Sequence, residues 1–180
     1  SLQAGWEPLP GAEREVAGIV DDLPGLDIDI RTGIAATESA FVEHAGGRDL
    51  IHFATHGEFP ENDAVDLHRI VLAAEGNHDG LLNAEEIRRT DLSAAQLVVL
   101  SICDGALVRF GPGDEPLGLL PAFFAAGVTN IVAPLWEIGD VAATEWMCAF
   151  YRDLLDLGPA RAVQRACLER IRAGAQVRDL

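Results

Sequence analysis

The stretch "LVVLSICDGA", Leu97 to Ala106, combines an apolar run that ends in Ser-Ile-Cys with an abrupt polar turn. A strand that is apolar at successive positions is typical of a parallel sheet that helices cover on both faces. The run ends at Cys103, and the Asp-Gly pair that follows favours a turn. Most lone cysteines in a core act as small hydrophobic residues, but a thiol at the tip of a strand is placed differently. Cys103 is therefore a candidate nucleophile.

A second strand has the same kind of ending. The stretch "RDLIHFATHG" predicts a strand over residues 49–55, followed by His56 and Gly57. If the two strands run parallel in one sheet, His56 and Cys103 emerge at the same edge, where the active sites of such sheets lie. The imidazole can then take the proton of the thiol, and the thiolate can attack a carbonyl. The backbone N–H groups of Gly57 and Cys103 are candidate donors to the resulting oxyanion.

Each of these residues also has a structural explanation. A lone cysteine at the end of a strand is usually part of the core, and a lone histidine there is usually structural. Because two strands have matching ends, the catalytic and the structural interpretations are about equally well supported. A serine hydrolase is not favoured, because the sequence contains no Gly-x-Ser-x-Gly motif.

Strands and helices alternate along the rest of the chain. Further strands are expected over residues 26–33, 69–76 and 128–136, and helices over 11–23, 37–46, 83–94, 119–127, 140–158 and 159–174. Thr37 and Asn83 are expected N-caps, and long loops are expected over 58–69 and 104–118. This order predicts an α/β fold with a mainly parallel sheet and helices on both faces. A chain of 180 residues is typical of a single domain, here 1–180.

The composition narrows the choice of partners and compartment. Twenty-nine acidic residues against 13 arginines give a formal net charge of −16, which argues against nucleic acid or an anionic membrane as a partner. No apolar run has membrane-spanning length, and the first residues lack the pattern of a signal peptide, so a cytoplasmic protein is expected. Three cysteines are too few for a disulfide framework. Cys148 and Cys167 are expected in the core on amphipathic helices.

Neither a metal nor another cofactor is expected. His52 and His56 are four positions apart, a spacing that suits zinc on a helix but is too wide for one ion on a strand. No Cys-x-x-Cys pair suggests structural zinc either. His52 is expected to pack inside. The remaining histidines, His44, His68 and His78, lie in polar stretches and are expected to face solvent.

Six stretches, in this order and spacing, resemble the CHAT domain, the caspase-like peptidase domain of bacteria that is related to caspases and separase. They are "DLIHFATHGEF" (49–59), "RIVLA" (69–73), "DGLLNAEEI" (79–87), "LVVLSICDGA" (97–106), "GLLPAFFAAGVTNIVAPLWEIGD" (118–140) and "FYRDLLDLGPARAVQRA" (150–166). The similarity runs from about Leu9 to about Gly174.

The resemblance implies a caspase-like three-layer sandwich and a cysteine endopeptidase. The His-Gly motif of the family falls on His56 and Gly57, and its nucleophile falls on Cys103, which together form a His–Cys dyad that needs no cofactor. In this family the substrate lies extended beside the sheet and pairs its backbone with the protein. The domain is commonly controlled by an attached sensor domain or by a partner protein, so a protein or peptide substrate and a regulatory partner are implied.

The resemblance also implies a specificity pocket. The segment from Pro134 to Asp140 resembles the loop that lines the pocket for the residue before the cut, with Trp136, Glu137 and Asp140 as substrate-binding residues. A guanidinium held by carboxylates is a strong contact, so cleavage after Arg or Lys is expected. Alternatively, Glu137 and Asp140 are solvated loop acids, with Asp140 capping the helix that follows. Ser101, where some basic-specific relatives carry aspartate, argues against the arginine pocket.

The chain also departs from the family pattern. The first strand and the last, aromatic-rich strand of the family have no full counterpart in residues 1–180. Such a domain would expose sheet edges that invite pairing with another chain. This leaves two alternatives to a peptidase open. One is a catalytically silent protein-interaction module on the same fold, and the other is a non-proteolytic thiol hydrolase or acyl transferase that uses the same dyad.

Overall fold

The computed structural model describes residues 6, 8–59, 68–102, 108–110, 116–136 and 138–175. The chain divides into two compact units. The first unit comprises residues 1–8 and 31–135 and is mixed α/β, whereas the second comprises residues 9–30 and 136–180 and is helical. The expected single domain over 1–180 stays a prediction.

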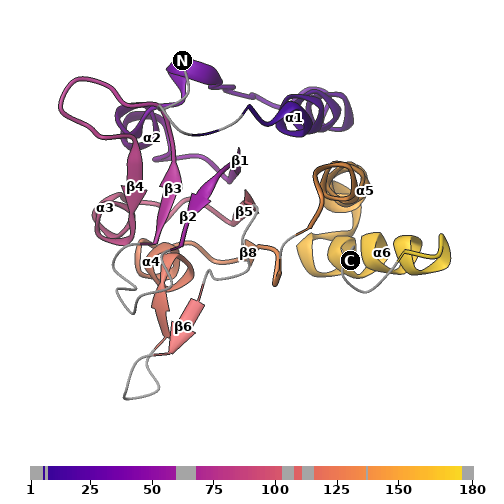
Figure 1. Ribbon diagram of the computed structural model, residues 1–180. Helices are drawn as coiled ribbons and strands as arrows, with labels where there is room; N and C mark the ends of the chain where they lie inside the picture. The colour runs from indigo at the N-terminus through magenta and orange to yellow at the C-terminus, as the bar shows by residue number, and fades with distance from the viewer. Residues whose placement is uncertain are drawn as a thin grey trace. The chain divides into compact units, whose positions relative to one another are not determined.

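The first unit contains a three-stranded parallel sheet (Figure 1). It consists of β1 (Leu50–Thr55), β5 (Leu97–Ile102) and β8 (Ile131–Val132), in the order β1-β5-β8. β5 is the middle strand, and all of its residues except Ser101 are buried. The continuous apolar run therefore does what the sequence indicated: it fills the middle of a parallel sheet. β8 is much shorter than the strand expected over 128–136.

A small antiparallel sheet begins directly after His56. Its strands are β2 (Gly57–Glu58), β3 (Arg69–Val71) and β4 (Leu81–Asn83), in the order β2-β3-β4. The loop expected at Glu58 is wrong, and the sequence carries no signal for the strand β4. Strands of two or three residues are too short to show a period of two.

The loop expected over 104–118 is also wrong for the described part of this segment. β6 (Val108–Phe110) and β7 (Pro116–Gly118) pair with each other as an antiparallel hairpin. Glycine and proline in this segment suggested a loop, but both residue types are tolerated at the ends and edges of short strands.

The helices of the first unit are α2 (Glu38–His44), α3 (Ala84–Arg89), α4 (Leu119–Ala125) and a 3₁₀ turn, η1 (Gly33–Ala35). Two of them, α2 and α3, start where the expected caps Thr37 and Asn83 lie. Thr37 Oγ1 accepts a hydrogen bond of 3.1 Å from the N–H of Ala40. Asn83 and Glu86 form a reciprocal capping box at α3, in which Asn83 Oδ1 accepts from Glu86 N–H at 3.1 Å and Glu86 Oε2 accepts from Asn83 N–H at 2.9 Å.

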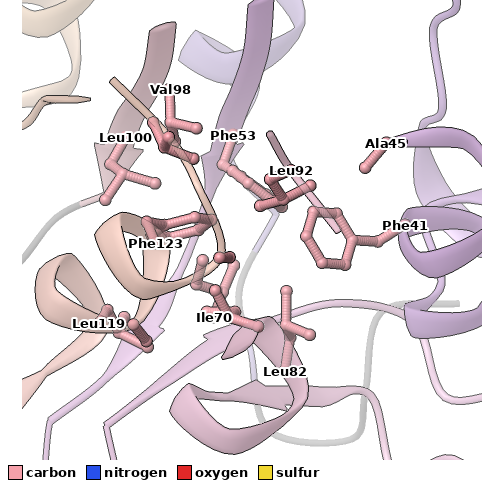
Figure 2. Packing of buried hydrophobic residues seen from close by; sticks show 14 of the residues in the cluster. Phe41, Ala45, Phe53, Ile70, Leu82, Leu92, Val98, Leu100, Leu119 and Phe123 are labelled. Atoms are coloured by element: carbon pink, nitrogen blue, oxygen red, sulfur yellow. The ribbon is translucent and has the colours of Figure 1, made fainter. Parts of the chain in front are cut away.

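The core of the first unit is built from all of these elements. Figure 2 shows Phe53 of β1 between Phe41 of α2 and Phe123 of α4, and the ring centroids lie 5.5 and 6.1 Å apart. Other members of the buried cluster include Ile70, Leu82, Ile87, Leu92, Val98, Leu100, Ile102 and Leu119. Burying one such side chain contributes about 1.5–3 kcal/mol. The core therefore packs the parallel sheet and the β2-β3-β4 sheet against the helices of this unit.

The described part of the second unit contains three helices, each at a position that the sequence predicted. They are α1 (Pro10–Asp22), α5 (Asp140–Leu157) and α6 (Pro159–Arg172). Trp146 and Phe150 of α5 are buried and stack at 5.4 Å. Cys148 and Cys167 are half-buried rather than fully enclosed. Within the described residues, every helix is too short or too polar to span a lipid bilayer.

The strand expected over residues 26–33 is wrong. Residues 26–32 are all described and contain no strand, and Gly33 begins η1. Leu26, Ile28 and Ile30 are exposed. Their alternation shows that they could share one face of a strand, but a strand forms only where a neighbouring strand satisfies its backbone groups.

Candidate active site

The carboxyl ends of β1 and β5 lie level with each other. The two strands are parallel neighbours, and their last paired residues are Thr55 and Ile102. His56 follows Thr55 in the chain, and Cys103 follows Ile102. The expectation that the two strands run parallel in one sheet is confirmed. Cys103 itself lies outside the described residues, so its pairing with His56 stays a prediction.

Strand β3 fixes the backbone of His56. The hydroxyl of Thr55 donates a hydrogen bond of 2.6 Å to the carbonyl oxygen of Val71. The N–H of Val71 in turn donates to the carbonyl oxygen of His56 at 2.9 Å. His56 is half-buried. One of these hydrogen bonds holds Thr55 and the other holds the backbone of His56. Together they fix the backbone from which the His56 imidazole extends.

Trp6 packs against the imidazole of His56. Their ring centroids lie 4.9 Å apart and their planes are inclined by 33°. Trp6 was not predicted as a site residue, since a single aromatic residue produces no periodic signal. An isolated tryptophan beside proline residues near a chain end is the only hint that the sequence offers. Contact with a flat aromatic surface restricts the orientations that the imidazole can adopt.

Gly57 is placed so that only glycine fits. A Cβ atom at this position would lie 2.6 Å from Cγ2 of Ile102 and would also collide with the ring of Phe59. The hydrogen of Gly57 therefore lets the chain after His56 pass against the last residue of β5. The sequence does not indicate this reason for glycine, because the contact depends on how the end of β5 packs beside Gly57.

The N–H of Gly57 points away from β3. Gly57 lies opposite Ile70, and the flanking hydrogen bond runs from Val71 N–H to the His56 carbonyl. This pattern makes Gly57 and Ile70 a non-hydrogen-bonded pair, in which the N–H and C=O groups point outward from the ladder. The N–H of Gly57 is thus directed away from β3 and takes no part in the β2–β3 pairing.

The expected specificity residues belong to the other unit. Trp136 and Asp140 are exposed in the second unit, and Glu137 lies outside the described residues. Asp140 is the first residue of α5, and Gly139 occupies the N-cap position without a side-chain cap bond. The alternative role of Asp140 as helix cap is therefore wrong. Its carboxylate lies instead against Gly11 of α1. The pocket formed by these three residues stays a prediction.

The histidines differ from the expectation in one place. His68 is fully buried, with its ring 5.2 Å from that of Phe59, so the expected solvent exposure is wrong. His68 directly precedes β3, whose packing into the core draws the imidazole inward. His52 is half-buried with its Nε2 shielded from solvent. His78 is exposed but lies beside Glu38, in a group of ligand-type side chains that also contains Glu86.

The comparisons with known proteins give one result. A comparison with curated proteins found no match. The model of the family described as CHAT domain matches residues 1–177 of the 180-residue chain. This match extends beyond both ends of the similarity expected from the sequence. The site at the ends of β1 and β5 and the surrounding α/β unit therefore lie within a chain that belongs to the CHAT domain family, which is commonly linked to caspase-like cysteine peptidases.

Proposed function

We propose that this CHAT domain is a cysteine endopeptidase with a caspase-like three-layer fold, in which His56 and Cys103 form the catalytic dyad. The observation that carries the proposal is the register of the parallel sheet. β1 and β5 are neighbours, and the pair Thr55–Ile102 ends both strands at one level. The next residue of each strand supplies a base and a nucleophile, at the sheet edge where α/β folds hold their active sites.

In the proposed mechanism the imidazole of His56 takes the proton from Sγ of Cys103. The thiolate then attacks the carbonyl carbon of the scissile peptide bond, and a negatively charged oxygen forms. The protonated imidazole donates its proton to the leaving amine as the carbon–nitrogen bond breaks. Water, deprotonated by the same imidazole, then hydrolyses the thioester and releases Cys103.

The N–H groups of Gly57 and Cys103 stabilise the oxyanion in this mechanism. For Gly57 the supporting observation is the outward direction of its N–H in the β2–β3 pairing. A donor that is already oriented loses no energy to rearrangement when the charge develops. The hydrogen bonds around Val71 and the ring of Trp6 support the same idea for His56, because they restrict where the base can move.

The substrate we propose is an extended protein or peptide segment cut after Arg or Lys. Trp136, Glu137 and Asp140 would line the pocket for the basic side chain. The net charge of −16 supports a cationic ligand, because an acidic surface attracts it. Control by a sensor domain or a partner protein belongs to the same proposal. Such control would keep the peptidase inactive until its signal is present.

A peptide library that varies the residue before the cut tests the proposal. The wild type is compared with Cys103→Ala and His56→Ala, and with Cys148→Ser and His44→Ala as matched controls outside the site. Cleavage after Arg or Lys is expected in the wild type and in both controls, and its loss is expected in both dyad variants. Cleavage after other residues would overturn the pocket and leave the dyad standing. Absence of cleavage, together with failure of a thiol-reactive probe to label Cys103, would favour a protein-interaction module.

A further inference from the structure

A buried carboxylate oxygen in the first unit is unsatisfied. Glu38, in the first turn of α2, is only 2% exposed. Its Oε2 accepts a hydrogen bond of 3.0 Å from the N–H of Gly80. Its Oε1 is shielded from solvent and has no hydrogen-bond partner in the described part of the chain. Since a buried carboxylate without a full set of partners is costly, this oxygen calls for a ligand.

Two further ligand-type side chains surround Glu38. His78 Nδ1 lies 3.6 Å from Oε2 of Glu38. Glu86 of α3 completes the group, in which one potential ligand atom from each of the three side chains lies within 4.8 Å of the other two. All three residues belong to the first unit. Their ligand atoms therefore converge from α2, α3 and the turn between β3 and β4.

The backbone holds His78 and Glu86 in place. Glu75 and His78 exchange two backbone hydrogen bonds of 3.2 and 2.9 Å across a tight turn, in which Gly76 adopts a φ of +59°. Such a two-residue turn fixes the position of His78. The capping bond of 2.9 Å from Asn83 N–H orients the carboxylate of Glu86 through its Oε2. The group is therefore arranged before any ligand arrives.

The electrostatic balance around Glu38 favours a cation. Burial is the main cause that raises the pKa of the Glu38 carboxyl above its ordinary value, and the negative charges of Glu86 and Asp79 raise it further. The Gly80 N–H and His78 act in the opposite direction. A carboxylate that is buried among other carboxylates is stabilised by a positive charge placed between them.

We propose that Glu38, His78 and Glu86 bind one divalent transition-metal ion, for which Zn²⁺ is the best match. Two carboxylates and one imidazole are ligands that zinc accepts, whereas Mg²⁺ and Ca²⁺ prefer oxygen ligands alone. Ligands at about 2.1 Å in a tetrahedron lie about 3.4 Å apart, so small side-chain rotations bring these atoms to bonding distance. Water would fill the fourth position. The site is separate from the proposed dyad, and the inference does not depend on peptidase activity.

The ion would be structural. It would join α2, α3 and the β3–β4 turn, and so brace the antiparallel sheet that begins directly after His56. Ligands that are far apart in the sequence form a site only in the folded chain, so the free energy of metal binding adds to the stability of the fold.

Zinc titration of the whole chain tests this inference. The protein carries Cys103→Ala, so that the proposed nucleophile cannot bind the metal, and is freed of metal with a chelator. Calorimetry is run with excess Mg²⁺, which suppresses diffuse binding to the acidic surface. We expect one Zn²⁺ per chain and a rise in melting temperature of about 5 °C or more when free Zn²⁺ exceeds its Kd about a hundredfold.

Three variants in the same background separate this site from others. Glu38→Gln keeps an acceptor for Gly80 N–H but removes the charge, and His78→Ala removes an exposed ligand, so both variants are expected to fold. Each should weaken zinc binding about tenfold or more. His44→Ala removes the imidazole of another His–Glu pair, 3.8 Å apart, and should bind zinc like its parent.

Cobalt substitution supplies an independent readout. Co²⁺ bound by oxygen and nitrogen should show visible absorption that His78→Ala loses, without the near-ultraviolet band that thiolate ligands produce. The inference would be overturned by absence of stoichiometric zinc binding, by zinc affinity in Glu38→Gln and His78→Ala equal to that of their parent, or by a thiolate band in place of the expected spectrum.

Discussion

Thr55 and Ile102 lie opposite each other as the last pair of two parallel strands. No sequence motif sets the two strands in this alignment. They end at the same position because of the register of the sheet. The contact between Gly57 and Ile102 reinforces this register, because a Cβ atom on Gly57 would lie 2.6 Å from Cγ2 of Ile102. The position at which β5 ends is thus coupled to the backbone of the His-Gly motif by packing as well as by pairing.

Replacement of Gly57 by alanine tests this coupling. The new Cβ would collide with the ring of Phe59 and lie 2.6 Å from Cγ2 of Ile102, so one or both of these side chains must move. We expect a loss of stability of about 1–3 kcal/mol, as for overpacked cores, and a larger relative loss of peptide cleavage. Gly46→Ala is the matched control, because its Cβ would meet only the carbonyl oxygen of Asp91 at 3.7 Å. Equal denaturant midpoints for the two variants would refute the coupling.

The hydroxyl of Thr55 is expected to stabilise the folded protein. Thr55→Val keeps the shape but removes the 2.6 Å hydrogen bond to the Val71 carbonyl, and leaves that acceptor less well satisfied. The free energy of unfolding should fall by about 1–2 kcal/mol. Thr55→Ser restores the donor and should recover most of the loss. Chemical denaturation of the three proteins measures the difference, and a serine variant as unstable as the valine variant would contradict the assignment.

Trp6 is expected to act as a positioning residue. Trp6→Ala removes the ring that packs on His56 at 4.9 Å. An aromatic contact of this kind is worth about 0.5–1.5 kcal/mol, so kcat/KM should fall by roughly two- to tenfold, and Trp6→Phe should retain more activity. The NMR signals of the His56 imidazole should also shift as the ring current disappears. Unchanged His56 signals in Trp6→Ala would exclude the contact in solution.

The thiol of Cys148 is expected to react slowly. Its burial raises the pKa of the thiol, and the negative charges of Asp22 and Glu15 raise it further. A raised pKa means that the fraction of thiolate at neutral pH is smaller than for an exposed cysteine, and that fast alkylation begins only at more alkaline pH. Mass spectrometry after brief iodoacetamide treatment at pH 7 should therefore find Cys103 labelled before Cys148. Preferential labelling of Cys148 would contradict this order.

The sequence predicted those parts of the fold that depend on a long apolar run or on contacts between residues close together in the chain. β5 follows from its continuous apolar run, and the starts of α2 and α3 follow from Thr37 and Asn83, whose side chains bond to neighbours three residues away. Local chemistry decides these features, so one sequence suffices to recognise them. The sequence also suggested that β1 and β5 run parallel in one sheet. It did not predict that the two strands are direct neighbours, which the structure shows.

Features that depend on packing between residues far apart in the chain could not be predicted from local sequence patterns. β2 and β4 contain only two and three residues, and their pairing with β3 creates them. The contact of Trp6 with His56 depends on the path of an irregular segment. The cluster of Glu38, His78 and Glu86 joins three elements, and no motif spacing relates its members. In each case the tertiary structure supplies the proximity that defines the feature.

The topology of the parallel sheet has a consequence for how the protein is made. β2, β3, β4 and α3 lie between β1 and β5 in the chain, so the pairing of Thr55 with Ile102 must close a long stretch before it contributes any stability. During synthesis β1 leaves the ribosome well before β5 exists. A nascent chain therefore holds the imidazole of His56 without the strand that delivers Cys103. Under the proposed function, hydrolysis starts only when translation of this segment and folding are complete, and unfinished chains are harmless to the cell that makes them.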